Sequence, residues 1–144
     1  MKTKCTRILV SGGAGFIGSH LCAQLLRDGC QVLCLDNLYT GSLENISTFM
    51  NMDSFEFLRM DVMDKRTLEM LNGYHIDAIY HLACPASPIH YQKNPIYTIR
   101  VSFEGTLNML ELAKHNGCPI LFSSTSEVYG NPKVNPQQED YLGN

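Results

Sequence analysis

The chain has 144 residues, of which 44% are hydrophobic and 17% charged, so it is long and apolar enough to build one globular domain. Its 11 basic and 14 acidic side chains give a net charge of -3, which argues against the basic surface of a nucleic-acid-binding protein. Because no apolar run approaches the ~20 residues of a membrane-spanning helix, and residues 1–7 lack the apolar stretch of a signal peptide, we expect a cytoplasmic protein with no membrane partner.

Short apolar runs alternate with helical patterns along the chain. In chain order, the sequence predicts a strand over 7–10, a helix over 16–27, a strand over 32–35, a short helix within 42–50, a strand over 55–60, a helix over 65–71, a strand over 78–82, a long helix from 95 to about 115, and a strand over 120–122.

Turn and capping residues separate these elements. Gly29 and Gly117 follow two of the helices, Asp64 is a predicted N-cap, and Pro95 suits a first helical turn. Strands that alternate with helices imply an α/β fold with a doubly wound parallel sheet of the Rossmann-like type. About five strands are few for this architecture, so the sheet is expected to be incomplete. From Gly130 onward the polar sequence predicts a loop.

A glycine-rich turn lies between the first strand and the first helix. Gly12 permits a tight turn, Gly15 lets the backbone approach a diphosphate, and Gly18 allows close packing of helix and strand. The helix N-terminus then offers N–H groups and a partial positive charge to the anion. The alternative is a glycine-rich turn that binds no ligand. This alternative is weaker, because the turn lies between a predicted strand and a predicted helix.

Acidic residues end the second and third strands. Asp36 is placed to bind both ribose hydroxyls of an adenosine, and its charge would repel a 2′-phosphate, which favours NAD over NADP. The alternative for Asp36 is a loop-capping turn. Asp61 is placed to face the adenine, and a turn carboxylate at a helix N-terminus is nearly as good an interpretation.

The cysteines show no disulfide or metal-binding pattern. No C-x-x-C pair occurs, and the histidines do not cluster with cysteines at zinc spacing. We therefore predict reduced thiols and no metal site. The six cysteines are Cys5, Cys22, Cys30, Cys34, Cys84 and Cys118.

Four further motifs follow the glycine spacing G-x-x-G-x-x-G: H-L-A-C-P-A-S-P over 81–88, Tyr91 with Asn94-Pro95, G-T-L-N-M-L over 105–110, and S-T-S-E-V-Y-G over 124–130. With them the chain resembles the UDP-glucuronate decarboxylases (UDP-xylose synthases) of the extended short-chain dehydrogenase/reductase family, over nearly its whole length. The resemblance implies NAD as cofactor, a nucleotide-sugar substrate, and a homodimer for the full-length family member.

The resemblance also assigns roles to individual residues. It places Thr125 and Glu127 at catalytic positions and Arg100 near the substrate. Besides Gly12 and Gly18, it implies NAD contacts at Gly15, Phe16, Ile17, Asp36, Asn37, Thr40, Gly41, Asp61, Val62, Leu82 and Cys84.

The implied reaction converts UDP-glucuronate into UDP-xylose and CO2. NAD takes a hydride from C4 of the sugar, the resulting β-keto acid loses CO2, and the hydride returns. Thr125 would hydrogen-bond the C4 oxygen, and Glu127 would orient the sugar or handle a proton at C5. Without the resemblance, capping of an exposed loop explains both residues equally well.

The family's catalytic tyrosine and lysine, four residues apart on one helix, find no counterpart. Tyr129 and Lys133 have the spacing, but Pro132 between them breaks a helix. We therefore expect residues 1–144 to be one NAD-binding domain, the N-terminal part of such an enzyme, truncated before the catalytic helix and the substrate lobe and inactive alone. Ser102 and Glu104 also depart from the family pattern.

Two other functions fit the same residues. One is another NAD-dependent nucleotide-sugar epimerase or dehydratase, similar to dTDP-glucose 4,6-dehydratase. The other is a non-catalytic NAD-binding module that senses the cofactor or joins a partner.

Overall fold

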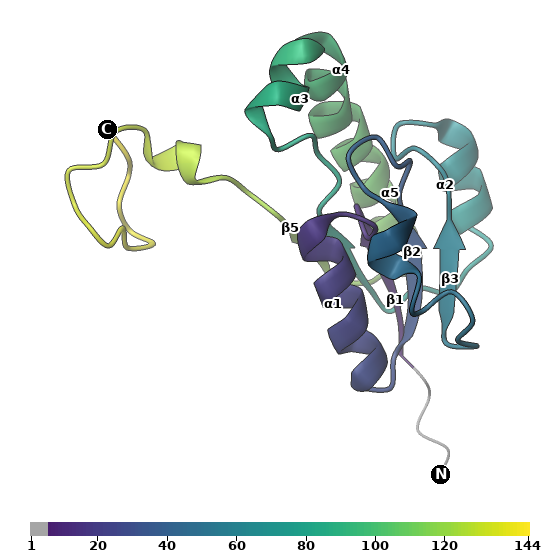
Figure 1. Cartoon of the computed structure of the whole chain (residues 1–144). Helices are drawn as coiled ribbons and strands as arrows, with labels where there is room; N and C mark the ends of the chain where they lie inside the picture. The colour runs from purple at the N-terminus through teal and green to yellow at the C-terminus, as the bar shows by residue number, and fades with distance from the viewer. Residues whose placement is uncertain (1–5) are drawn as a thin grey trace.

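Five parallel strands form one sheet in the order β3-β2-β1-β4-β5 (Figure 1). A computed structural model of the chain describes residues 6–144. The chain runs outward from β1 to β3 and then returns to the other side of β1 with β4, which confirms the predicted doubly wound sheet. The strands are β1 (Arg7–Ser11), β2 (Gln31–Leu35), β3 (Phe55–Leu58), β4 (Ala78–His81) and β5 (Ile120–Phe122).

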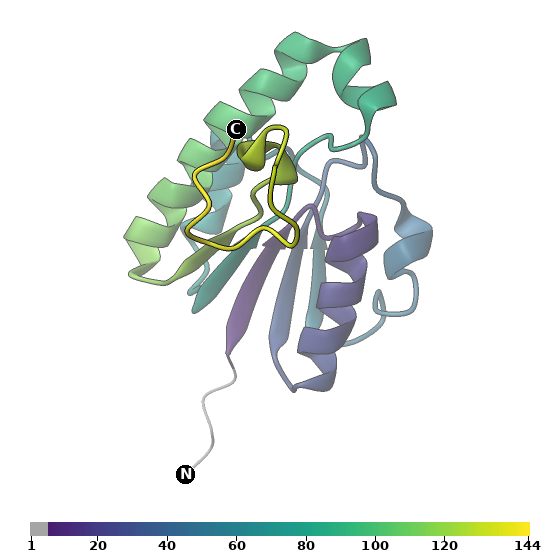
Figure 2. The same cartoon turned by 90° about the vertical axis from the view of Figure 1, so that its left-hand side faces the viewer.

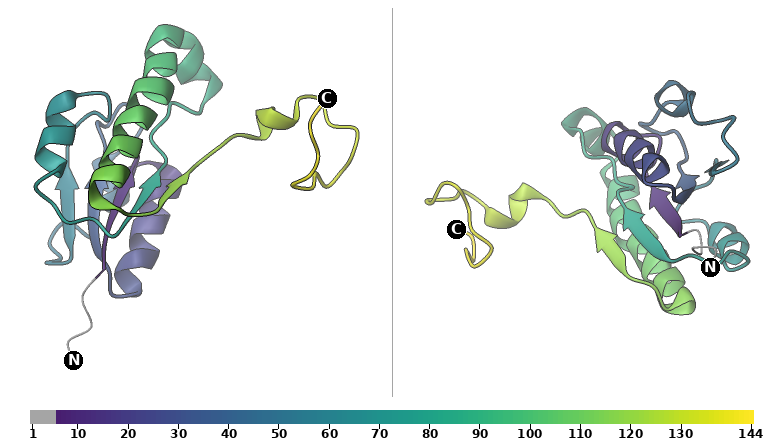
Figure 3. Two further views of the ribbon diagram at one scale, coloured as in Figure 1. Left: turned by 180° about the vertical axis from the view of Figure 1, so that it is seen from behind. Right: turned by 90° about the horizontal axis from the view of Figure 1, so that it is seen from below.

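Helices cover both faces of the sheet (Figures 2 and 3). On one face α1 (Phe16–Arg27) packs through Cys22 and Leu25 against Ile8 and Val10 of β1. On the other face α2 (Lys65–Leu71) and α5 (Thr106–Asn116) share a core with Leu9 and Leu33. Because both faces are covered, β1 and β2 are continuous apolar runs that do not alternate with polar residues.

The predicted helix ends are confirmed where a specific cap exists. Asp64 caps α2, because its side chain accepts the N–H of Arg66 at 2.9 Å. Gly117 ends α5 in the left-handed conformation, with a φ of 61°. The short helix expected within 42–50 is a single 3-10 turn, η1 (Leu43–Ile46).

The long helix predicted from 95 to about 115 has the expected extent, but it is not one regular α-helix. It consists of α4 (Pro95–Arg100), a π-helical segment η2 (Val101–Gly105) and α5. The hydroxyls of Thr98, Ser102 and Thr106 each donate to the carbonyl four residues earlier, at 3.1, 2.9 and 2.6 Å. Such side-chain bonds compete with the backbone for these carbonyls and loosen the regular helix where the π turn forms.

One helix was not predicted. The segment before α4 forms α3 (Pro88–Lys93), with Ser87 at its N-cap position and no buried residue. A six-residue helix without a buried face leaves no apolar periodicity in the sequence, so the pattern could not reveal it.

The chain leaves the sheet after β5. Residues 123–144 extend to one side (Figures 1 and 3) and contain one 3-10 turn, η3 (Ser126–Tyr129), which was not predicted. From Gly130 onward the segment is the loop that the polar sequence predicts. The Asn144 N–H donates to the Tyr129 carbonyl at 3.1 Å, which folds this segment back on itself. Over residues 6–144 no helix has both the length and the apolar character needed to cross a bilayer.

Truncation of buried Leu112 tests the core beneath α5. Leu112 is fully buried, whereas Leu110 on the same helix is 48% exposed. We expect Leu112→Ala to lower the free energy of unfolding by about 2 to 5 kcal/mol through lost apolar contact and a cavity. The matched control Leu110→Ala should cost less than about 1 kcal/mol. Urea denaturation followed by circular dichroism measures both, and equal losses would contradict the assignment of the core.

Candidate functional site

A cavity of about 440 Å³ opens at the carboxyl edge of the sheet. All five strands contribute to its wall through residues that follow them: Gly12, Asp36, Asp61, Ala83 and Ser123. The strand order reverses between β1 and β4, and ligands of open α/β sheets bind at this switch point.

The glycine-rich turn brings the N-terminus of α1 to this cavity. Gly12 has a φ of +75°, and a Cβ atom there would lie 2.9 Å from the Ala83 nitrogen after β4. A Cβ atom on Gly18 would overlap the Gly12 carbonyl oxygen. Two of the three predicted reasons for glycine, the tight turn at Gly12 and the close packing of the helix at Gly18, are therefore confirmed, and the reason given for Gly15 stays a prediction. The first N–H groups of α1 have no acceptor within the helix and suit an anion.

Asp36 is buried at the end of β2 and holds the turn in place. One carboxylate oxygen accepts the Ala14 N–H at 3.0 Å, and the other accepts the Leu38 N–H at 2.8 Å. The loop-capping interpretation is therefore correct, yet Asp36 also lines the cavity. Because each carboxylate oxygen has two lone pairs, capping leaves acceptor capacity for a ligand hydroxyl.

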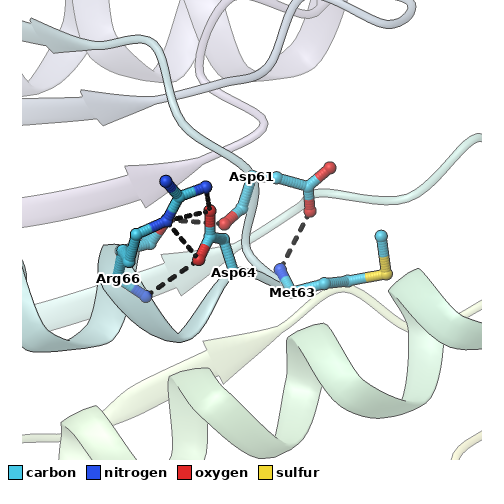
Figure 4. A network of polar contacts seen from close by, with 5 residues as sticks. Asp61, Met63, Asp64 and Arg66 are labelled. Carbon is cyan, nitrogen blue, oxygen red and sulfur yellow. Dashed lines mark hydrogen bonds and ion pairs between the residues drawn. The ribbon is translucent and has the colours of Figure 1, made fainter.

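Asp61 lies beside the N-terminus of α2 (Figure 4). One of its carboxylate oxygens accepts the Met63 N–H at 2.9 Å, and the other accepts hydrogen bonds from Asn37 and Tyr97. Arg66 pairs with Asp64 at 2.7 Å. Asp61 thus combines the turn role and the cavity position that the sequence left as alternatives.

His81, the last residue of β4, is a buried residue that the sequence analysis missed. Its Nδ1 lies 2.6 Å from the Ser11 hydroxyl and its Nε2 lies 3.1 Å from the Thr106 hydroxyl. Burial lowers the pKa of His81 to about 4, so the ring is neutral at neutral pH. Its hydrogen bonds link β1, β4 and α5 next to the glycine-rich turn.

The cavity collects nearly all of the predicted cofactor-binding residues. Gly41 is the exception, and it packs against Ala14 and Asp36. The predicted residues that line the cavity are Gly12, Gly15, Phe16, Ile17, Gly18, Asp36, Asn37, Thr40, Asp61, Val62, Leu82 and Cys84.

The predicted catalytic and substrate-binding residues lie outside the cavity lining. Thr125 caps η3, because its hydroxyl accepts the Glu127 N–H at 3.2 Å, which is the alternative role weighed for both residues. Arg100 pairs with Glu104 across one turn of exposed helix at 2.9 Å. The roles assigned to these residues by resemblance stay predictions.

Three aromatic residues of the cavity wall were missed: Tyr39, His90 and Tyr97. His90 belongs to the unpredicted helix α3. A signal for Tyr97 existed, since the predicted helix start at Asn94-Pro95 places Tyr97 in the first turn, and the Asn94 side chain accepts the Tyr97 N–H at 3.1 Å. The sequence did not show that this turn faces the end of β3.

Tyr129 and Lys133 do not share a helix, as predicted. Tyr129 ends η3, Gly130 follows with a φ of 63°, and the Lys133 N–H donates to the Tyr141 hydroxyl at 3.1 Å.

The thiols of Cys22, Cys34, Cys84 and Cys118 are free, and Cys5 lies outside the described residues. A hydrogen bond with Cys22, followed by burial, raises the pKa of Cys34 far above its usual value. Within residues 6–144, no three His, Cys, Asp or Glu side chains are grouped so that they could hold a metal ion.

Residues 9–142 match the protein family described as GDP-mannose 4,6 dehydratase. Curated relatives include UDP-glucuronic acid decarboxylase 4 of Arabidopsis thaliana, 50% identical over 144 residues, and UDP-glucuronic acid decarboxylase 1 of Danio rerio, 49% identical over 137 residues. These matches cover 100% and 95% of this chain and 31% of each relative, so the chain spans about a third of their length.

Solved structures show the same fold. Epimerase Mth375 from Methanothermobacter thermautotrophicus superposes with a TM-score of 0.87 at 30% identity, over 97% of this chain and 41% of that one. UDP-glucose 4-epimerase from Thermus thermophilus, in complex with NAD, gives a TM-score of 0.81 at 33% identity, over 96% and 44%.

The lowered pKa of His81 predicts a dependence of stability on pH. The unfolded chain binds this proton near pH 6.5 and the folded chain near pH 4. The unfolded state therefore binds more protons between these values, and the free energy of unfolding falls as the pH drops through this window, by about 3 kcal/mol in total. His81→Gln should flatten this part of the profile.

Urea denaturation between pH 4 and 7 measures the effect. His115→Gln, which changes an exposed histidine of α5, is the control and should keep the slope of the unchanged protein. Identical slopes in all three proteins would contradict the assignment of a neutral, buried His81.

Proposed function

The chain belongs to the GDP-mannose 4,6 dehydratase family, and from this premise we propose that it forms the NAD-binding portion of a UDP-glucuronate decarboxylase. The complete enzyme would convert UDP-glucuronate into UDP-xylose and CO2. Relatives about 50% identical over nearly the whole chain carry the name of that activity, and the position of the cavity at the switch point of the sheet supports a dinucleotide cofactor.

The observation that carries the proposal is that Asp36 and the glycine-rich turn lie at the same cavity and are joined by a hydrogen bond from the Ala14 N–H to Asp36. The same cavity presents a buried carboxylate with free acceptor capacity and the N-terminus of α1. A dinucleotide with a ribose diol and a diphosphate matches this pair of groups. Asp36 would accept hydrogen bonds from the ribose hydroxyls, and its charge would disfavour a 2′-phosphate.

NAD, when bound, supplies a site that takes a hydride from the sugar and returns it. The chain's own residues bind and shield this group. Phe16 and Ile17, 80% and 68% exposed at the start of α1, would lose water against the cofactor. Thr125 and Glu127 follow the cavity residue Ser123 by a few positions, and we propose that they bind the sugar at C4 and C5.

Sequence identity favours the decarboxylase over the epimerase alternative. The two solved epimerases described above are 30% and 33% identical to this chain, whereas the decarboxylases are 48% to 52% identical. The coding sequence after residue 144 separates the two functions. A decarboxylase would continue in frame into a tyrosine and a lysine four residues apart, whereas a non-catalytic NAD-binding module would bind NAD without such a pair. Calorimetric titration with NAD measures the binding that both functions share.

Asp36→Asn tests the ribose contact. The amide keeps the shape of the side chain but replaces one acceptor oxygen by a donor, and we expect the affinity for NAD to fall about tenfold. The preference for NAD over NADP should narrow, because the negative charge that repels the 2′-phosphate is gone. The control is Asp28→Asn at the opposite, exposed end of α1. Unchanged NAD affinity in Asp36→Asn would contradict the proposed site.

A purified polypeptide of these 144 residues should form no UDP-xylose from UDP-glucuronate and NAD. Its one tyrosine–lysine pair with the family spacing, Tyr129 and Lys133, lies on a turn and not on one helix face. Chromatographic separation of the nucleotide sugars measures the product, and NAD binding by the same sample serves as the positive control. Turnover above that of a heat-denatured sample would contradict the expectation that the reaction requires a tyrosine and a lysine on one helix face.

A further inference from the structure

Three polar side chains from separate parts of the chain meet at the cavity wall. Asp61 follows β3, Asn37 follows β2, and Tyr97 lies in α4. The Asn37 amide donates to the second carboxylate oxygen of Asp61, Oδ2, at 2.7 Å and to the Tyr97 hydroxyl oxygen at 2.8 Å. The Tyr97 hydroxyl donates to the same Asp61 oxygen at 3.1 Å.

The backbone determines the direction of these hydrogen bonds. The carbonyl oxygen of the Asn37 side chain accepts the Tyr39 N–H at 2.9 Å, so its amide hydrogens point toward Asp61 and Tyr97. Because the Tyr97 oxygen accepts one of them, its own hydrogen is directed to Asp61. Both lone pairs of Asp61 Oδ2 are therefore used within the protein.

The other oxygen, Oδ1, keeps acceptor capacity. It accepts one N–H, from Met63 at 2.9 Å (Figure 4), and a carboxylate oxygen has two lone pairs. Asp61 lines the cavity. Its carboxylate thus offers an oriented acceptor, and no donor, at the end of β3.

Ring packing and a raised pKa keep the Tyr97 hydroxyl in place as a hydrogen-bond donor in this network. Its ring packs 5.0 Å from the ring of Tyr39, which in turn lies 6.0 Å from the ring of His90. Burial, together with the charge of Asp61, raises the pKa of Tyr97 to about 12, so its hydroxyl stays protonated at neutral pH. The aromatic contacts and the cap at Asn94 hold its ring in one place.

We propose that Tyr97 and Asn37 are positioning residues that give the site its preference for adenine over other bases, by orienting Asp61 so that Oδ1 accepts the exocyclic amino group of the base. This inference rests on the proposed NAD site. A base with a carbonyl oxygen in place of the amino group would meet a carboxylate acceptor and be disfavoured, because two acceptors repel and neither gains a hydrogen bond.

Calorimetric titration with NAD and with nicotinamide hypoxanthine dinucleotide, which carries a carbonyl in place of the amino group, tests the proposal. We expect the unchanged protein to bind NAD about tenfold or more tightly than the analogue. Tyr97→Phe should narrow this ratio about threefold to tenfold, because Asp61 loses a donor that holds it. Tyr91→Phe makes the same chemical change in α3, outside the cavity lining, and should keep the ratio.

Asn37→Asp is the second variant, and it keeps the size and the Tyr39 contact of Asn37. It removes both amide donors and adds a like charge beside Asp61. The ratio of the affinities for NAD and for the analogue should therefore narrow further than in Tyr97→Phe. The ratio of the affinities for NAD and for the hypoxanthine analogue separates this role from a purely structural one. If the residue served only the fold, its substitution would lower both affinities equally and leave their ratio unchanged.

The outcomes distinguish the two proposals. NAD binding with an unchanged base ratio in both variants would overturn the role of Tyr97 and Asn37 while leaving the NAD site intact. Failure of the unchanged protein to bind NAD would overturn the proposed function, and this inference with it.

Discussion

The carboxyl edge of the sheet depends on one close contact between backbones, that of the loop after β1 with the residues after β4. Only glycine at position 12 allows the contact, because a side chain there would lie against Leu82 and Ala83. The contact directs the chain into α1, and Gly18 then lets the helix lie directly on the turn. The position of the α1 N-terminus at the edge of the cavity follows from this approach.

Buried polar groups around this contact hold the strands and loops that end beside the cavity. Asp36 accepts two backbone N–H groups and still faces the cavity, and His81 links two strands to α5 through hydroxyl groups. Within the described residues, no buried side-chain nitrogen or oxygen lacks a hydrogen-bond partner. The site is therefore preorganised, since the groups that would meet a ligand are already held by the protein.

The irregular helical region from α3 to α5 adds a second wall to the cavity. The π turn and the close packing of Gly105 against Val62 bring this region to the end of β3, where a Cβ atom at position 105 would lie 2.6 Å from a Val62 methyl group. Tyr97 thereby reaches Asp61 across a sequence separation of 36 residues. The face turned away from the sheet leaves Ile96, Ile99 and Phe103 exposed.

Local signals in the sequence were sufficient to predict the doubly wound sheet and the glycine-rich turn. These signals are apolar runs, Asp64 and Gly117 as caps, and acidic residues at strand ends. Most of the predicted cofactor-binding residues came from the family resemblance, and all of them except Gly41 line the cavity. The folded chain was needed to show that Asp36 and Asp61 also cap their own loops, that α3 exists, and that Tyr97, Asn37 and His81 belong to networks. Such contacts join residues far apart in the chain, and their hydrogen-bond geometry depends on how the helices pack, which no local pattern records.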